Sequence, residues 1–111
     1  MNIRFADRHI RFRVSSSELE RLLTGRSLTL DVPMPRSHQF RANISVTPLT
    51  EWQLDSDPTG IWLTLPRSAL EDLLRELPSK EGLEREFQLD GASLRVSFEV
   101  DLRRENEKKA A

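Results

Sequence analysis

A pattern that occurs twice, 51 positions apart, constrains this chain more than any other feature. Residues 10–14 alternate apolar with polar side chains, and leucines at helical spacing follow up to Leu23. Residues 61–74 repeat that order, so that Leu19 matches Leu70 and Leu22 matches Leu73. Alternation predicts a strand with one buried face, and apolar residues three or four positions apart predict an amphipathic helix. Each copy is therefore expected to be a strand that leads directly into a short helix.

Further alternating segments flank both copies, so each half is predicted to be a hairpin, a helix and a second hairpin. A one-sided sheet of about fifty residues exposes its apolar face, and pairing the two halves about a pseudo-two-fold axis would bury both faces. The sequence thus predicts an α+β fold with a duplicated β-β-α-β-β unit, about eight mainly antiparallel strands and two short helices. A closed barrel and an open sheet both fit this pattern. We expect one domain over residues 1–104, with repeats at about 1–48 and 50–103, and a charged, disordered tail at 105–111.

Local signals mark the ends of these elements. Ser15, followed three residues later by Glu18, forms a capping-box pattern for the first helix, and Gly25 supplies a left-handed stop. Pro66 suits the first position of the second helix, where its missing N–H has no partner to lose. Pro33 is expected to end the strand that starts at residue 28.

Composition and charge exclude several classes of protein. The chain has no cysteine, which rules out disulfides and thiolate zinc sites. Its start lacks the apolar run of a signal peptide, and no segment approaches the roughly 18–20 apolar residues of a membrane span. These features favour a cytoplasmic protein without membrane contact.

The net charge of −1 conceals two unlike halves. Residues 1–48 hold eight arginines against four acidic residues, and residues 49–111 hold nine basic against fourteen acidic residues. This asymmetry suits a basic face for an anionic partner, or head-to-tail self-association. The alternative is that the two halves neutralise each other within one fold.

The segments at 3–5 and 10–22, with Gly25 after them, resemble the opening of a small family of uncharacterised bacterial domains. That family ends in a strand similar to residues 94–101, although typical members carry a lysine where Val100 stands here. The resemblance implies a related fold over nearly the whole chain, and it implies no activity and no site.

Charged residues on the predicted strands form the first candidate site. Glu99 and Asp101 point to one face of the last strand, about 7 Å apart. They would lie opposite Arg11 or Arg13 if the first hairpin neighbours the last strand, forming ion pairs worth roughly 0.2–1 kcal/mol each. The alternative is a mixed-charge face, extended by Arg103, that holds a metal-bound polyphosphate.

Trp62 is the second candidate, because alternation places it on the outer face where Arg11 stands in the first copy. An exposed tryptophan could anchor a protein partner or a homodimer contact, or it could pack under an arginine as a cation–π pair. Nucleic-acid binding is not expected, because the arginines of the first hairpin have no aromatic stacking partner on their face other than Trp62.

Nothing in the pattern of residues favours catalysis. His9 and His38 have no second ligand at metal-binding spacing and are expected to be solvated, and the serines at 15–17 are explained by helix capping. We therefore expect no catalytic residue, no metal and no cofactor, and lean against an enzyme. The leading hypothesis is a non-enzymatic interaction domain, acting as a homodimer or with an unknown protein partner. The alternative is a binder or hydrolase of a phosphorylated anionic ligand on the mixed-charge face.

Overall fold

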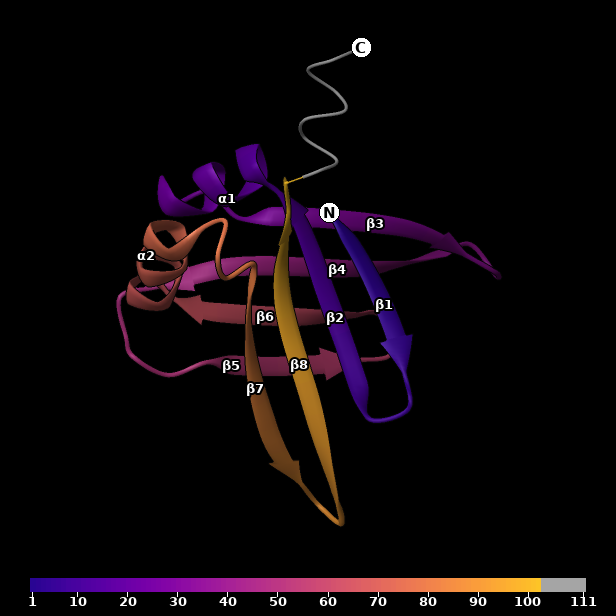
Figure 1. Cartoon of the computed structure of the whole chain (residues 1–111). Helices are drawn as coiled ribbons and strands as arrows, with labels where there is room; N and C mark the ends of the chain where they lie inside the picture. The colour runs from indigo at the N-terminus through magenta and orange to yellow at the C-terminus, as the bar shows by residue number, and fades with distance from the viewer. Residues whose placement is uncertain (103–111) are drawn as a thin grey trace.

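The computed structural model describes residues 1–102, which form two four-stranded sheets and two helices (Figure 1). Sheet A has the order β1 (Asn2–Ala6), β2 (His9–Ser15), β8 (Ala92–Asp101), β7 (Gly82–Leu89). Sheet B has the order β3 (Leu28–Met34), β4 (His38–Thr47), β6 (Gly60–Pro66), β5 (Gln53–Asp57). The helices are α1 (Ser16–Leu23) and α2 (Arg67–Glu76). The predicted α+β class is confirmed, and of the two predicted arrangements the strands adopt open sheets.

Each sheet combines one hairpin from each half of the chain. The hairpin β1–β2 lies beside β7–β8, and β3–β4 lies beside β5–β6. All four hairpins are antiparallel, as predicted, whereas the central pairs β2–β8 and β4–β6 are parallel. The two halves therefore exchange their second hairpins, and neither half completes a sheet alone.

The strand registers reproduce the duplication residue by residue. Phe12 pairs with Phe98 in sheet A, and the equivalent pair in sheet B is Leu63 with Ile44. The sequence separation between equivalent residues of β3 and β7 differs by one from the separation between those of β4 and β8. The loops account for this difference, because the β3–β4 loop has three residues and the β7–β8 loop has two. Equivalent backbone bonds of 2.9 Å also link the strands to the loops, from Arg95 N–H to the Arg8 carbonyl and from Arg41 N–H to the Thr59 carbonyl.

The core lies between the two sheets, whose strands cross one another, and both helices lie together along one side of them (Figure 1). Inward-facing residues of the central strands and the leucines of both helices are almost completely buried, as the periodicity predicted. They include Phe12, Phe98, Ile44, Leu63, Leu19, Leu22, Leu70 and Leu73. Neither helix has the length and apolar character that a membrane crossing requires.

Helix α1 begins and ends with the motifs that the sequence indicated. The Ser15 hydroxyl accepts a bond from the Glu18 N–H, and a Glu18 carboxylate oxygen accepts from the Ser15 N–H. Burial would raise the pKa of Glu18, but bonds from the Met1 ammonium and from Ser15 outweigh it and hold that pKa below its usual value. At the other end Gly25, with φ +93°, and Arg26 donate to the Leu22 and Arg21 carbonyls in a Schellman motif.

Several predicted boundaries were wrong by a few residues. Strand β3 continues through Pro33 to Met34, because β3 is an edge strand and a proline there removes no bond from the ladder interior. Residues 36–39 have the composition of a loop, but β4 already begins at His38. Pro66 precedes α2 as its N-cap residue and does not occupy the first helical position. The predicted tail at 105–111 lies outside the described residues.

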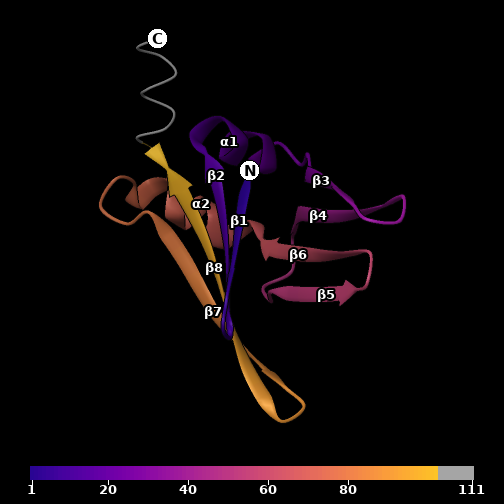
Figure 2. The same cartoon turned by 90° about the vertical axis from the view of Figure 1, so that its right-hand side faces the viewer.

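Strand β7 is the largest departure from the sequence-based expectation. Residues 79–82 lack apolar alternation and predict a linker, but the strand already begins at Gly82 and runs for eight residues to Leu89. Its hairpin with β8 extends past the other strands of sheet A (Figure 2), and Leu94 pairs with β7 alone because the β2–β8 register begins at Arg95. One edge of sheet A is therefore a long strand whose outer side pairs with no other strand of residues 1–102.

The α1 cap yields a direct test of stability. Replacing Ser15 by alanine removes the acceptor for the Glu18 N–H, and we expect the free energy of unfolding to fall by about 1 kcal/mol. The matched control is Ser68→Ala, at an exposed position in the first turn of α2. Chemical denaturation should show a loss for Ser15→Ala and no comparable loss for Ser68→Ala. Equal effects of both substitutions would contradict the capping account.

Candidate functional site

The outer face of sheet A carries three of the charged residues that the sequence singled out. Arg13 lies opposite Glu99 in the parallel β2–β8 register, and Arg11 lies one position earlier on the same face, opposite Ser97. These side chains point outward because the alternate residues Phe12 and Phe98 point into the core. The hypothesis that the first hairpin neighbours the last strand is confirmed.

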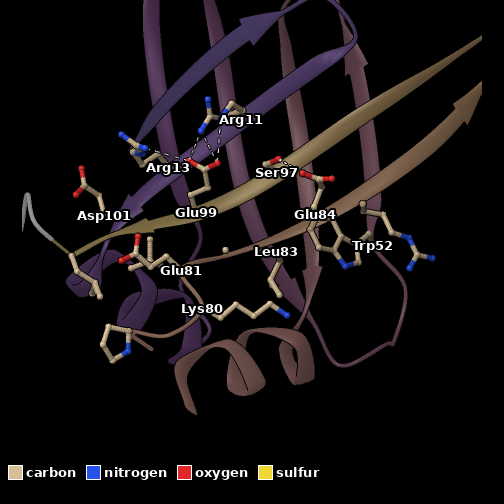
Figure 3. Close-up of a pocket in the computed structure, with 15 residues that line it drawn as sticks. Arg11, Arg13, Trp52, Lys80, Glu81, Leu83, Glu84, Ser97, Glu99 and Asp101 are labelled. Carbon is tan, nitrogen blue, oxygen red and sulfur yellow. Dashed lines mark hydrogen bonds and ion pairs between the residues drawn. The ribbon is translucent and has the colours of Figure 1, made fainter. Parts of the chain in front are cut away.

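Glu99 binds both arginines at once (Figure 3). Arg11 donates from Nε and Nη2 in three bonds of 3.0–3.3 Å, and Arg13 donates from Nη2 at 3.4 Å. We call these three residues the Arg–Glu–Arg cluster. Its side chains keep between 24% and 40% of their accessible surface, so solvent screens each ion pair and each contributes at most about 1 kcal/mol.

A chain of three polar side chains lies beside the cluster. Ser97 is almost completely buried; its Oγ lies 2.7 Å from His9 Nε2 and donates to a Glu84 carboxylate oxygen at 3.3 Å. A hydroxyl has one proton, so with that proton on the bond to Glu84, His9 must be the donor in the other bond. His9 was expected to be a solvated loop residue, and this expectation was wrong, because His9 is the half-buried first residue of β2.

A groove of about 920 Å³ connects these residues with the edge of the sheet (Figure 3). Residues 80–85, which are the two positions before β7 and its first four, line it together with Trp52 and the outer face of β8. Gly82 lies opposite Glu99, where a Cβ would stand 3.0 Å from the Phe98 carbonyl oxygen and 3.3 Å from Glu99 Cγ. The missing side chain therefore leaves room for the Glu99 carboxylate and deepens the groove there.

Among residues 1–102, the side chains that line the groove carry no net charge. Four basic side chains line it, and they are Arg11, Arg13, Lys80 and Arg85. Four acidic side chains line it as well, and they are Glu81, Glu84, Glu99 and Asp101. Such a mixed surface suits a ligand that carries both signs of charge or neither, and it gives no long-range attraction for an anion.

The predicted site residues fall into two groups. Arg11, Arg13 and Glu99 are bonded to one another, and Asp101 lines the same groove from the end of β8. Trp62 does not line the groove; it is half-buried on the outer face of sheet B, where its ring end lies 3.2 Å from the site of a Cβ at Gly60. The role of Trp62 as a partner anchor stays a prediction.

Sequence reasoning missed several residues of the groove, and they are Trp52, Lys80, Gly82, Glu84 and Ser97. Glu84 and Ser97 occupy outward positions of alternating strands, which was the available signal. Whether these two side chains contact each other depends on the register between β7 and β8, and the hydrophobic pattern alone does not determine that register. Gly82 and its neighbours gave no strand signal, because residues 79–82 lack apolar alternation.

The two copies of the repeat differ most at this site. In sheet B, Ser45 and Thr64 take the positions of Glu99 and Arg13, and their hydroxyl oxygens lie 3.2 Å apart. Likewise, the bond from Asn43 Nδ2 to Thr29 Oγ1, 3.0 Å long, replaces the bond from Ser97 to Glu84. The same backbone arrangement thus forms with neutral side chains, so the fold itself does not require the charges of sheet A.

Comparison with known proteins gives a family and no activity. The family of unknown function DUF7009 matches residues 1–110. The chain belongs to this family. The match covers both halves, so the duplicated unit lies within the DUF7009 match, and the expected resemblance to a family of uncharacterised domains is confirmed. No curated protein and no solved structure matches the chain.

The difference between the copies predicts how the DUF7009 domain responds when its cluster is replaced. The double variant Arg13→Thr/Glu99→Ser installs the residues of sheet B in sheet A, and we expect its free energy of unfolding to stay within about 1 kcal/mol of the wild-type value. Glu99→Ala alone should be the less stable variant, because it leaves two adjacent arginines without their shared partner. Denaturant unfolding of both variants measures this, and a double variant that fails to fold would show that the cluster is structural.

Proposed function

We propose that this DUF7009 domain is a non-enzymatic interaction domain that binds an extended segment of a partner protein along the edge of β7. The observation that carries the proposal is the lining of the groove by the first four residues of β7, 82–85, together with the two residues that precede them. A groove on the face of a sheet is lined by alternate residues of a strand. Consecutive residues line a groove that follows the strand edge, which is where an added strand binds.

The open backbone groups of β7 support this mode of binding. Val100 N–H donates to the Glu81 carbonyl at 2.8 Å, which makes these two residues a hydrogen-bonded pair. In an antiparallel ladder such pairs alternate, so residues 83, 85 and 87 bond to β8. The N–H and C=O groups of residues 82, 84, 86 and 88 point away from β8 and are available to a partner strand.

The side chains along β7 indicate the chemistry of the partner. Glu84 and Glu86 project on the outer face, where basic side chains of the added strand would lie. Leu83 lies on the core side of β7, and both it and Trp52 pack partly against the core. An extended segment that alternates apolar with basic residues would therefore match both sides of the edge.

The His9–Ser97–Glu84 chain supports a binding role in preference to hydrolysis. A serine nucleophile must be reached by the substrate that it attacks. The Ser97 hydroxyl is bonded to His9 and to Glu84, and its side chain is almost completely buried. Burial therefore keeps the Ser97 oxygen from a substrate in the groove.

Selection of binding peptides tests the proposal. A display library of randomised peptides as long as β7, eight residues, should yield peptides that bind the purified chain. The variant Glu86→Pro removes an outward-facing N–H and blocks close approach of a strand, so we expect it to weaken binding at least about tenfold, or roughly 1.4 kcal/mol. Glu86→Ala is the matched control, because it removes the carboxylate and keeps the N–H. Peptides that bind Glu86→Pro as tightly as the wild-type chain would overturn the proposal.

A phosphorylated anionic ligand is the second candidate function, because Arg11 and Arg13 lie side by side in the groove. Against it, Glu99 occupies the space between the guanidinium groups and binds both of them. An anion would have to displace this carboxylate or bind beside it, and the charge of the groove is balanced. The arrangement therefore supports this candidate less than strand binding.

Thermal stabilisation by inorganic phosphate separates the two candidates. If the groove binds a protein strand, phosphate should leave the wild-type Tm unchanged, whereas Glu99→Gln frees both arginines and should gain a phosphate-dependent rise in Tm. The opposite result, stabilisation of the wild-type chain that Glu99→Gln abolishes, would favour the phosphorylated ligand.

A further inference from the structure

The two edges of sheet A carry opposite charges on one face. A single row of the register crosses the sheet from Arg4 on β1 through Arg11 and Ser97 to Glu84 on β7. Glu86 extends the acidic end of this face along β7. In Figure 1 β1 and β7 border sheet A on opposite sides, so the basic and acidic ends face away from each other.

Strand β1 has the composition that the β7 edge requires. Ile3 and Phe5 alternate with Arg4, whose guanidinium is exposed and forms no hydrogen bond or ion pair with any other residue of the range 1–102. Phe5 keeps 62% of its accessible surface although it lies on the core side of the sheet. A short edge strand thus exposes an apolar side chain on one face and an unpaired cation on the other.

The charges discriminate among the three ways in which two such sheets can join edge to edge. Pairing β1 with β1 brings Arg4 side chains together, and an antiparallel pairing of β7 with β7 brings Glu84 and Glu86 rows together. Like charges placed opposite each other destabilise a strand pair. Only the pairing of β1 with β7 joins opposite charges and keeps both core-side faces aligned.

We propose that copies of this chain associate head to tail, with β1 of one copy added to β7 of the next. This inference rests on the proposed strand-binding role of β7 and names a second copy as the occupant. Strands β1 and β7 run in the same direction within sheet A, since each is antiparallel to its neighbour and those neighbours are parallel. With both faces aligned, the added strand is parallel to β7.

The contacts of this arrangement follow from the alternation. Arg4 of one copy lies beside Glu84 and Glu86 of the next, whose carboxylates are about 7 Å apart along the strand. Glu86 is available for such a contact, because within the described range it receives one bond, from Gln88 at 3.4 Å. Ile3 and Phe5 then lie on the side of Leu83 and Trp52, which covers the exposed phenylalanine.

A head-to-tail contact leaves one edge free at each end of the assembly. The interface is heterologous, so a third copy can add in the same way and the assembly grows as an open series. Sheet B offers no equivalent pair of edges, because β3 contains Pro33 and β5 carries aspartates at positions 55 and 57. Growth is therefore confined to the edges of sheet A.

Charge reversal at the two edges tests the inference. Sedimentation velocity of the full chain at low salt, where exposed charges are least screened, should show a mass that rises with protein concentration beyond two copies. Arg4→Glu and Glu86→Lys should each weaken the association at least about tenfold, which corresponds to roughly 1.4 kcal/mol. An equimolar mixture of the two variants should regain it, because each reversed edge then meets an opposite charge. The control Asp55→Lys reverses a charge on the edge strand β5 and should have no effect.

Each other outcome overturns the inference in a distinguishable way. If the mass of the wild-type chain never exceeds two copies, and Glu86→Lys strengthens this association, the result would indicate pairing of β7 with β7. Failure of the mixture to associate would show that Arg4 and Glu86 do not meet. A chain that stays monomeric at every concentration, while selected peptides still bind β7 and lose binding in Glu86→Pro, would overturn self-association and leave the proposed function intact.

Discussion

The parallel pairing of β2 with β8 determines the rest of the structure. It joins segments as far apart as Arg13 and Glu99, 86 positions along the chain, and its equivalent in sheet B joins β4 to β6. Because both central pairs combine strands of different halves, the apolar faces can be buried only when the two halves exchange hairpins. The exchange also brings the arginines of β2 to the acidic residues of β7 and β8, so the groove exists only in the assembled fold.

The sequence predicted the parts of this fold that depend on local periodicity. Alternation identified the inward-facing residues of β2, β6 and β8, and the leucine spacing identified both helices, because burial of one face imposes those periods. Alternation determines on which face of a sheet a residue lies, and it does not determine which strand lies beside it. Arg11 and Trp62 were therefore both assigned correctly to outer faces, although the structure places them on different sheets. The start of β7 was missed because Gly82, a glycine opposite Glu99, carries no strand signal.

The two outer faces show how one framework supports different surfaces. The positions of Arg13 and Glu99 in sheet A correspond to hydroxyl side chains in sheet B, and the backbone registers are the same. Partly exposed ion pairs contribute little to stability, so their presence in only one copy has no evident structural cause. In the proposed strand-binding role, these charges would fix the register of the added strand and exclude wrong partners.

Amide hydrogen exchange along β7, followed by NMR in dilute protein and in protein saturated with a selected peptide, tests the central claim most directly. In dilute protein the account predicts slow exchange at residues 83, 85 and 87, whose N–H groups bond to β8, and fast exchange at residues 84, 86 and 88. Saturation should slow the fast set and leave the slow set unchanged. Exchange at residues 84 and 86 that stays fast in the saturated protein would contradict strand addition at this edge.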